Sequence, residues 1–183
     1  MSRQELKIAG FGGQGVVLSG HIVGQAAAVY DKGYATFSQS YGPEARGGSC
    51  TAEVVISDEP IGYPYLVTPN VVVILSQDAY NKYGKNLVPG TILIIDNDLV
   101  KTEPGVNALS IPATRLARET LGRVVVANII LLGFLAAVSN IVSTDALRKS
   151  VLASVPKGTG DFNMKAFELG YSRGVEAVKG KNG

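Results

Sequence analysis

The sequence predicts an α/β protein: a single three-layer α/β/α domain over residues 1–183 with a mostly parallel sheet. Short apolar runs rich in β-branched residues alternate with longer stretches of helical periodicity. No linker, repeat or low-complexity segment divides the 183 residues, a length that fits one domain of roughly 100–200 residues. The first apolar run leads through a glycine-rich turn into a helix, which is a Rossmann-like start.

The expected strands are short and bounded by turn residues, at residues 6–9, 35–37, 52–56, 71–75 and 91–95. Several of them are continuous apolar runs rather than clean alternations of apolar and polar residues. Because strands that are buried on both faces have this pattern, it predicts a sheet with helices on both sides.

The helical segments have recognisable boundaries. Residues 16–30 form the first, and helical periodicity dominates after Pro112, a residue suited to a first helical turn. Ser143 is placed to cap a helix that Pro156 ends. The apolar run 124–138 is shorter than the ~18–20 residues of a membrane span, so we expect a buried core helix. Its Asn128 is expected to hydrogen-bond a neighbouring loop.

The last helix has an apolar stripe at steps of three and four, expected to face the core or an interface: Met164, Phe167, Tyr171, Val175 and Val178. Gly170 and Gly174 are one turn apart in the same helix. Glycine costs about 1 kcal/mol relative to alanine inside a helix. We therefore expect this pair to allow the close approach of another backbone.

Composition excludes several classes of function. The net charge of +2 and the lack of a basic run argue against binding to nucleic acid or to a membrane surface. With no secretory signal, we expect a cytoplasmic protein. The single Cys50 excludes an internal disulfide and a self-contained cysteine cluster, and we expect a buried thiol there. The single His21 is expected to be an ordinary helix-face residue. Charged residues are 17%, below the usual ~25%, which favours a substantial interface.

The first candidate site is the glycine turn, which comprises Gly10, Gly12, Gly13, Gln14 and Gly15. Backbone N–H groups at the start of a helix bind anions, and the helix dipole adds to that attraction. The spacing matches G-x-G-x-x-G, which is a weak signal alone and a stronger one between a strand and a helix. Close packing of helix and strand without a ligand is the alternative explanation of these glycines.

A dinucleotide site requires one further feature, an acidic residue at the end of the second strand that binds the ribose hydroxyls. Here that strand runs into Ser40 and Tyr41, with no carboxylate before Glu44. The missing acid weakens the interpretation of the glycine turn as an NAD site.

The second candidate site is the loop that contains Ser40, Tyr41, Glu44, Arg46 and Gly47. An arginine side chain offers a planar fork to carboxylate or phosphate, and Glu44 is placed to orient it. A solvated turn with a local ion pair is the alternative. Both loops follow strand ends, so if the first two strands are neighbours, the loops share a crevice or an interface.

Asp96 and Asp98 follow the fifth expected strand. Two carboxylates in a turn are possible ligands for Mg²⁺, but turns commonly contain aspartate and asparagine. We therefore expect a surface turn rather than a metal site.

The pair of segments Gly12-Gly13-Gln14-Gly15 and Ser40-Tyr41-Gly42-Pro43-Glu44-Ala45-Arg46-Gly47-Gly48 resembles the gamma subunit of the 2-oxoacid:ferredoxin oxidoreductases. The resemblance covers nearly the whole chain, and the second segment looks most like the 2-oxoglutarate branch. The family decarboxylates a 2-oxoacid, forms an acyl-CoA thioester and reduces ferredoxin. The resemblance implies a subunit in which the two loops contact coenzyme A or a partner subunit.

The resemblance also implies where the cofactors are held. Thiamine diphosphate and Mg²⁺ are expected between other subunits, and 4Fe-4S iron–sulfur clusters in cysteine-rich subunits. The expected partners are alpha and beta subunits and a ferredoxin-like delta subunit, with ferredoxin bound through the complex. In this chain the resemblance implies no cofactor, no metal ligand and no catalytic residue. Two alternatives stay open: a stand-alone nucleotide-binding oxidoreductase domain and a pure assembly scaffold.

Overall fold

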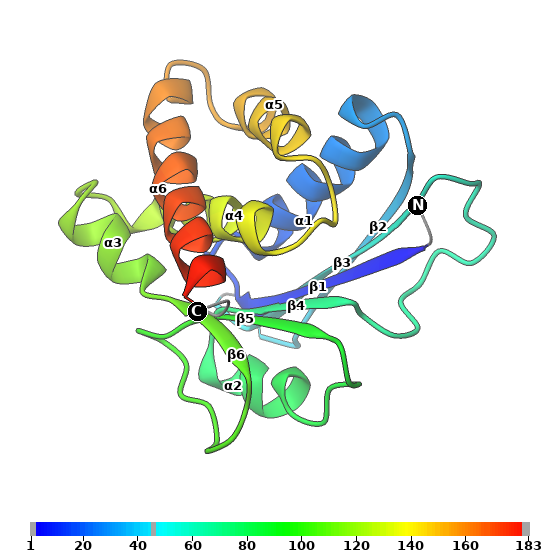
Figure 1. Cartoon of the computed structure of the whole chain (residues 1–183), viewed down its shortest axis with the longest axis horizontal. Helices are drawn as coiled ribbons and strands as arrows, with labels where there is room; N and C mark the ends of the chain where they lie inside the picture. Colours follow the sequence, from blue (N-terminus) through cyan, green and yellow to red (C-terminus); the bar gives the residue numbers. More distant parts are fainter. Residues whose placement is uncertain (1–2, 45–46, 181–183) are drawn as a thin grey trace.

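The computed structural model describes residues 3–44 and 47–180, whose strands form one six-stranded sheet. The strand order is β2-β3-β1-β4-β5-β6 (Figure 1). Parallel pairing joins β1 to β4, β4 to β5 and β5 to β6, whereas β3 is antiparallel to both of its neighbours. The predicted α/β fold with a mostly parallel sheet is confirmed. The strands are β1 (Gln4–Phe11), β2 (Tyr34–Tyr41), β3 (Ser49–Ser57), β4 (Val71–Ile74), β5 (Ile92–Asp96) and β6 (Ala108–Ile111).

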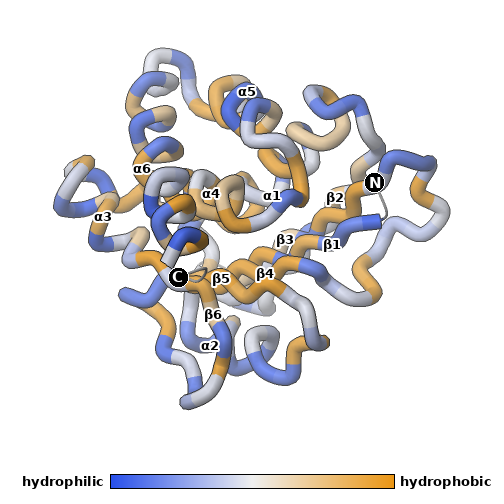
Figure 2. Tube along the Cα trace, viewed as in Figure 1, coloured by the Kyte–Doolittle hydropathy of each residue, from blue (hydrophilic) through white to orange (hydrophobic). Residues whose placement is uncertain are grey.

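The helices divide unequally between the two faces of the sheet. One face has α2 (Gln77–Ala79) and its π-helical continuation η2 (Tyr80–Gly84), while the longer helices lie on the other (Figure 1). The apolar residues gather in the central strands and in α4 (Figure 2). The longer set comprises α1 (Val16–Gln25), its π-helical extension η1 (Ala26–Tyr30), α3 (Ala113–Glu119), the 3-10 turn η3 (Val124–Val126), α4 (Ala127–Val138), α5 (Thr144–Ser154) and α6 (Gly160–Lys179).

Two expectations about strands need correction. The sequence pattern missed β6, which pairs with β5 from Leu93 and Ala108 onward. It also predicted a covered second strand, but β2 is at the edge of the sheet and its Tyr34 and Tyr41 are exposed. A four-residue strand has too little sequence for a periodic signal, and edge position depends on strand order, which local pattern does not record.

The first two strands are not neighbours, because β3 lies between them. The physical reason is that β3, which follows β2 after a short connection, returns antiparallel to β2 and also pairs with β1. The ends of β1 and β2 nevertheless lie at the same edge of the sheet, since β3 runs antiparallel to each of them.

The helix boundaries follow the predicted signals with one exception. Ser143 caps α5, its Oγ accepting a hydrogen bond from Ala146 N at 3.1 Å, and α5 ends shortly before Pro156. The apolar run 124–138 contains the predicted core helix, α4, but its first residues form η3 and Val125 is 74% exposed. That exposed start lies beside the candidate site.

The predicted apolar stripe of the last helix faces the core over most of its length. Phe167 is fully buried, and Met164 and Tyr171 pack against the core, but Val178 at the end of the helix is exposed. Gly170 and Gly174 are also turned inward. A Cβ atom on Gly170 would clash with the carbonyl oxygen of Ile130 in α4. The two helices therefore pack backbone to backbone, as the predicted role of the glycine pair requires.

We predict that Gly170→Ala lowers the free energy of unfolding by about 3 kcal/mol, because the added methyl group forces α6 away from α4. Gly24→Ala in α1 is the matched control, since its added methyl group would find Val54 Cγ1 at an ordinary 3.7 Å. That variant should be neutral or more stable by up to about 1 kcal/mol. Urea unfolding monitored by circular dichroism measures both changes. Equal stability of the two variants would contradict the close helix contact.

Candidate functional site

The glycine turn connects β1 to α1 at the carboxyl edge of the sheet. Gly15 is the N-cap of α1, with a left-handed backbone (φ +76°), and its carbonyl oxygen accepts the first helical hydrogen bond from Ser19 N at 2.9 Å. No side chain caps this helix, and its first turn has no acidic residue. The turn therefore leaves the partial positive charge of the helix start without a side-chain acceptor.

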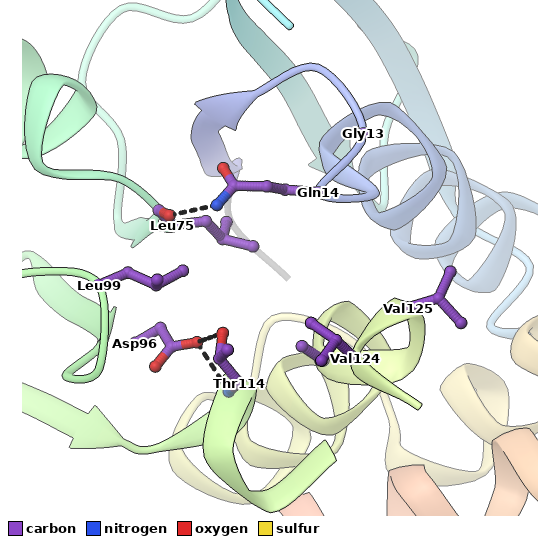
Figure 3. A pocket seen from close by; sticks show the side chains of 9 residues that line it. Gly13, Gln14, Leu75, Asp96, Leu99, Thr114, Val124 and Val125 are labelled. Atoms are coloured by element: carbon purple, nitrogen blue, oxygen red, sulfur yellow. Dashed lines mark hydrogen bonds between the residues drawn. The ribbon is translucent and has the colours of Figure 1, made fainter. Parts of the chain in front are cut away.

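The side chain of Gln14 holds the turn in place. Its Oε1 accepts a hydrogen bond from Phe11 N at 2.6 Å, and its Nε2 donates to Leu75 O at 2.7 Å (Figure 3). These bonds join the end of β1 to the segment that follows β4. Gln14 thus positions the loop, and the idea that it also faces a ligand stays a prediction.

The second predicted loop lies against the first. Gly12 N donates a hydrogen bond to Gly48 O at 2.8 Å, so the hairpin between β2 and β3 contacts the glycine turn directly. Glu44 folds back over Gly42 and Gly48 within its own hairpin. Ser40, Tyr41 and Gly47 are exposed at the same edge, whereas Arg46 lies outside the described residues.

Asn128 of α4 packs against Gly15 of the glycine turn. A Cβ atom on Gly15 would lie 2.5 Å from Asn128 Nδ2, so only glycine fits there. The amide nitrogen of Asn128 donates a long hydrogen bond of 3.4 Å to Ser19 Oγ in α1. The predicted hydrogen bond to a neighbouring loop is therefore wrong: Asn128 packs against the turn at Gly15, but its hydrogen bond goes to the helix.

A cavity of about 340 Å³ opens beside the turn (Figure 3). Gln14 lies on one side of it, and Asp96 and Thr114 lie on another. Its lining is mostly apolar, and Leu99, Val124 and Val125 are its exposed large apolar members. Sequence reasoning missed Leu99 because a single apolar side chain in a loop has no recognisable pattern, and it assigned Val124 and Val125 to a buried core helix. The lining residues are Gly13, Gln14, Leu75, Asp96, Leu99, Thr114, Val124, Val125 and Ala127.

Asp96 is not the surface residue that the sequence predicts, since it is only 1% exposed. Its Oδ2 accepts hydrogen bonds from Thr114 N at 2.9 Å and from Thr114 Oγ1 at 2.6 Å (Figure 3). Asp98 Oδ2 accepts from Arg115 N at 2.8 Å. The two carboxylates therefore cap the start of α3. Burial raises the pKa of Asp96, and the hydrogen bonds from Thr114 partly oppose that rise.

Both α1 and α3 begin at this edge of the sheet, but they differ in whether side chains accept hydrogen bonds from their first N–H groups. In α3, Thr114 N and Arg115 N already donate to carboxylates of the same chain. In α1, no side chain among residues 3–44 and 47–180 caps the first turn. An anion that enters the site is therefore attracted to α1 and repelled by the acidic groups at α3.

Cys50 and His21 lie where the sequence predicts them, one buried and one on the surface of a helix. Cys50 is 3% exposed in β3, and burial raises the pKa of its thiol. His21 is on the surface of α1, with its ring 6.3 Å from that of Phe37. Within the described ranges, no group of three His, Cys, Asp or Glu side chains is placed to hold a metal ion. None of the helices in those ranges is long and apolar enough to cross a membrane.

Comparison with known proteins shows the family to which the chain belongs. The sequence profile of the family described as pyruvate ferredoxin/flavodoxin oxidoreductase matches residues 5–173. The chain belongs to this family. The 2-oxoglutarate synthase subunit KorC of Methanocaldococcus jannaschii is 49% identical over 173 residues, which cover 92% of each chain.

Solved structures of family members have the same fold. The gamma subunit of a keto/oxoacid ferredoxin oxidoreductase from Geobacter sulfurreducens superposes with a TM-score of 0.87 at 38% identity, covering 97% of this chain and 99% of that one. A 2-oxoglutarate:ferredoxin oxidoreductase from Magnetococcus marinus, solved with 2-oxoglutarate, coenzyme A and succinyl-CoA bound, gives 0.83 at 25% identity. There the match covers 95% of this chain but 31% of the other. The predicted kinship with oxidoreductase gamma subunits is confirmed.

We predict that Asp96 makes stability depend on pH in a defined direction. Because its pKa is raised above the ordinary 3.8 in the folded state, the folded protein holds this proton more tightly than the unfolded chain does. The stability contribution of Asp96 therefore falls as pH rises from about 4 through the raised pKa. The free energy of unfolding of wild type minus that of Asp96→Asn should decrease over that interval and then level off.

Urea titrations of the two proteins between about pH 3.5 and pH 8 measure this difference. Thr114→Val serves as a control, because it keeps the carboxylate and removes one hydrogen-bond donor that favours its charged form. The expected decrease should be larger in that background. A difference that grows with pH would show that the hydrogen bonds outweigh burial.

Proposed function

We propose that this chain serves as the gamma-type subunit of a complex that oxidises 2-oxoglutarate, and that its glycine edge helps to seat coenzyme A. The substrate proposal is supported by the relatives, because both the Methanocaldococcus and the Magnetococcus proteins bear 2-oxoglutarate in their names. In such a reaction, 2-oxoglutarate and coenzyme A give succinyl-CoA and carbon dioxide. Two electrons pass to ferredoxin, and one proton is released.

One observation carries the coenzyme A proposal: the uncapped start of α1 adjoins a mostly apolar cavity. Coenzyme A has the matching halves, which are anionic phosphates and a long, largely uncharged pantetheine arm. The phosphates would take the N–H groups at the helix start, as phosphates do in other glycine turns. The uncharged arm would lie along Leu99 and Val124, where burial of apolar surface favours it.

The glycines of the turn have separate tasks in this proposal. Gly12 and Gly13 leave the outer surface of the turn free of side chains, and both are exposed. Gly10 leaves room for Gln14 Oε1, while Gly15 leaves room for Asn128. The first pair thus admits a ligand to the backbone, and the second pair holds the backbone that receives it.

The hairpin would form the adjoining wall. Ser40 and Tyr41 are exposed there, and the contact of Gly12 with Gly48 brings the hairpin against the turn. Arg46 would offer its guanidinium to a phosphate or to a carboxylate of a partner subunit, with Glu44 and Gly47 shaping the loop around it.

The redox and thiamine chemistry is assigned to the partner subunits. We expect alpha and beta subunits to hold thiamine diphosphate with Mg²⁺, and cysteine-rich chains to hold the iron–sulfur clusters. When bound, those groups supply the carbanion chemistry and the electron path. The contribution of this chain is to bind and orient coenzyme A and to cover the site from water. A cytoplasmic location is part of this proposal.

We predict that Val125→Asp raises the apparent KM for coenzyme A by about fivefold. A new negative charge near the helix start repels phosphate by about 1 kcal/mol in water. Val125→Lys, which changes the same exposed position with the opposite charge, should leave that KM unchanged or lower it. Reduction of ferredoxin or a dye by the assembled complex measures both.

Val88→Asp is the control for added charge alone, because Val88 is 53% exposed and outside the cavity lining. The KM for 2-oxoglutarate should stay constant in all three variants. If Val125→Asp and Val125→Lys change the KM for coenzyme A equally, shape and not charge is responsible, and the phosphate position is wrong.

We predict that Arg46→Ala raises the apparent KM for coenzyme A by about tenfold, because it removes a charge-assisted hydrogen bond. The same kinetic assay, with the subunit composition measured by gel filtration, checks this. An unchanged KM together with loss of partner subunits would make the hairpin an assembly element. Full turnover and an unchanged KM in a complete complex would leave no role for Arg46 in the site.

A further inference from the structure

A second surface, away from the glycine edge, shows the features of a built interface. It consists of the outer edge of β2 over residues 34–39 and the loop of residues 59–68, which we call the tyrosine face. Tyr34, Tyr63 and Tyr65 are about half exposed, and Val67 is 70% exposed. Thr36 of β2 donates a hydrogen bond from Oγ1 to Pro64 O at 2.7 Å, so strand and loop are in contact. The loop and the β2 edge lie on one side of the molecule (Figure 1).

The loop is held rigidly by a buried carboxylate. Glu5, which is 3% exposed, accepts hydrogen bonds at its Oε2 from Val67 N at 2.7 Å and from Thr68 N at 2.6 Å. Its Oε1 accepts from Arg3 Nε at 2.6 Å. Hydrogen bonds to a carboxylate are stronger than those between neutral groups, so the bonds to Glu5 help to order the loop.

Arg3 binds the same loop, and we call Glu5 and Arg3 together the clamp. Its two terminal nitrogens donate to Tyr63 O at 2.7 Å and to Tyr65 O at 2.6 Å. The rings of these two tyrosines contact each other edge to face, with centroids 5.7 Å apart. The clamp thus acts on the backbone and leaves the aromatic side chains in solvent. Ordering a loop before binding lowers the entropy cost of forming an interface.

The described edge of β2 has no charge, proline or bulge of its own that would prevent pairing. Its sequence from Tyr34 to Tyr41 contains no charged residue and no proline, and neither charge nor bulge interrupts its eight-residue pairing with β3. Residues 60–68 are uncharged as well. Exposed sheet edges normally have charges, prolines or bulges that prevent contact with other chains. Tyrosine is also among the residues enriched where proteins bind each other.

We infer that the tyrosine face docks a partner subunit of the same oxidoreductase complex, which lays an extended, uncharged segment along β2. The Magnetococcus relative supports this occupant, because the fold of this chain covers only 31% of that protein. Further polypeptide is therefore joined to this domain there, and in the present protein separate subunits would supply the equivalent surface. The segment would pair with the free N–H and C=O groups of β2 and accept hydrogen bonds from the tyrosine hydroxyls. This face and the coenzyme A edge are separate proposals.

Hydrogen–deuterium exchange of the full chain, alone and in the complex purified through a tag on another subunit, tests the docking directly. Peptides that cover residues 34–39 and 59–68 should exchange at least tenfold more slowly in the complex. A peptide from 172–179 at the end of α6 is the internal control and should not change. Unchanged exchange in both tyrosine-face peptides would overturn the proposal.

Substitution gives a second, independent measurement. Tyr65→Asp should reduce the partner subunits recovered with the chain at least tenfold, while Leu152→Asp on α5, at a similar exposure of 50%, should leave recovery unchanged. Equal recovery for the two variants would overturn the proposal, whereas the exchange experiment on wild type decides it if Tyr65→Asp does not fold.

Light scattering of the isolated chain checks the rival occupant. A stable homodimer with the peptide 34–39 already protected would assign the face to a second copy of this chain and overturn the proposal. The docking test is also distinct from the coenzyme A test. Failure at the tyrosine face leaves the effect of Val125→Asp on KM intact, and an unchanged KM leaves the docking result intact.

Discussion

The left-handed backbone at Gly15 is the constraint on which most of this structure depends. Its φ of +76° ends the turn after β1 and starts α1, and the space where a side chain would stand is filled by Asn128 of α4. The position of α4 is therefore set against the glycine turn. Because α4 and α6 pack backbone to backbone at Gly170, the position of α6 follows from the same contact. The cavity wall at Ala127 belongs to α4 and is fixed in the same way.

Local sequence signals predicted the parts of the fold that depend on local chemistry. The turn from β1 into α1 needs glycines wherever it occurs, and the serine at 143 caps its helix through a contact three residues away. Strand order depends instead on contacts between distant segments. Nothing within residues 42–48 records that β3 will pair with β1 as well as β2, and a strand as short as β6 acquires its identity from pairing with β5.

The candidate site also has parts that depend on local sequence and parts that depend on contacts between distant segments. Both loops at the sheet edge were predictable, because each follows a strand and has residues suited to anions. The cavity between the glycine turn and α3 was not, since it exists only where η3 and the loop after β5 meet. Asp96 shows the physical reason. Its sequence context is that of a turn, but β6 leads the chain into α3 directly above it, and the carboxylate is buried against Thr114.

The polar side chains at this edge are largely occupied by the protein itself. Both functional atoms of Gln14 bond to backbone, and Asp96 and Asp98 bond to the start of α3. What the edge leaves for a ligand is thus mainly backbone at α1 and apolar surface around the cavity. Such groups are positioned when the protein folds, so a ligand meets fixed donors and loses little free energy in ordering them. A ligand can reach backbone groups only where no Cβ atom stands between the ligand and the backbone. This requirement accounts for the many glycines in the turn between β1 and α1.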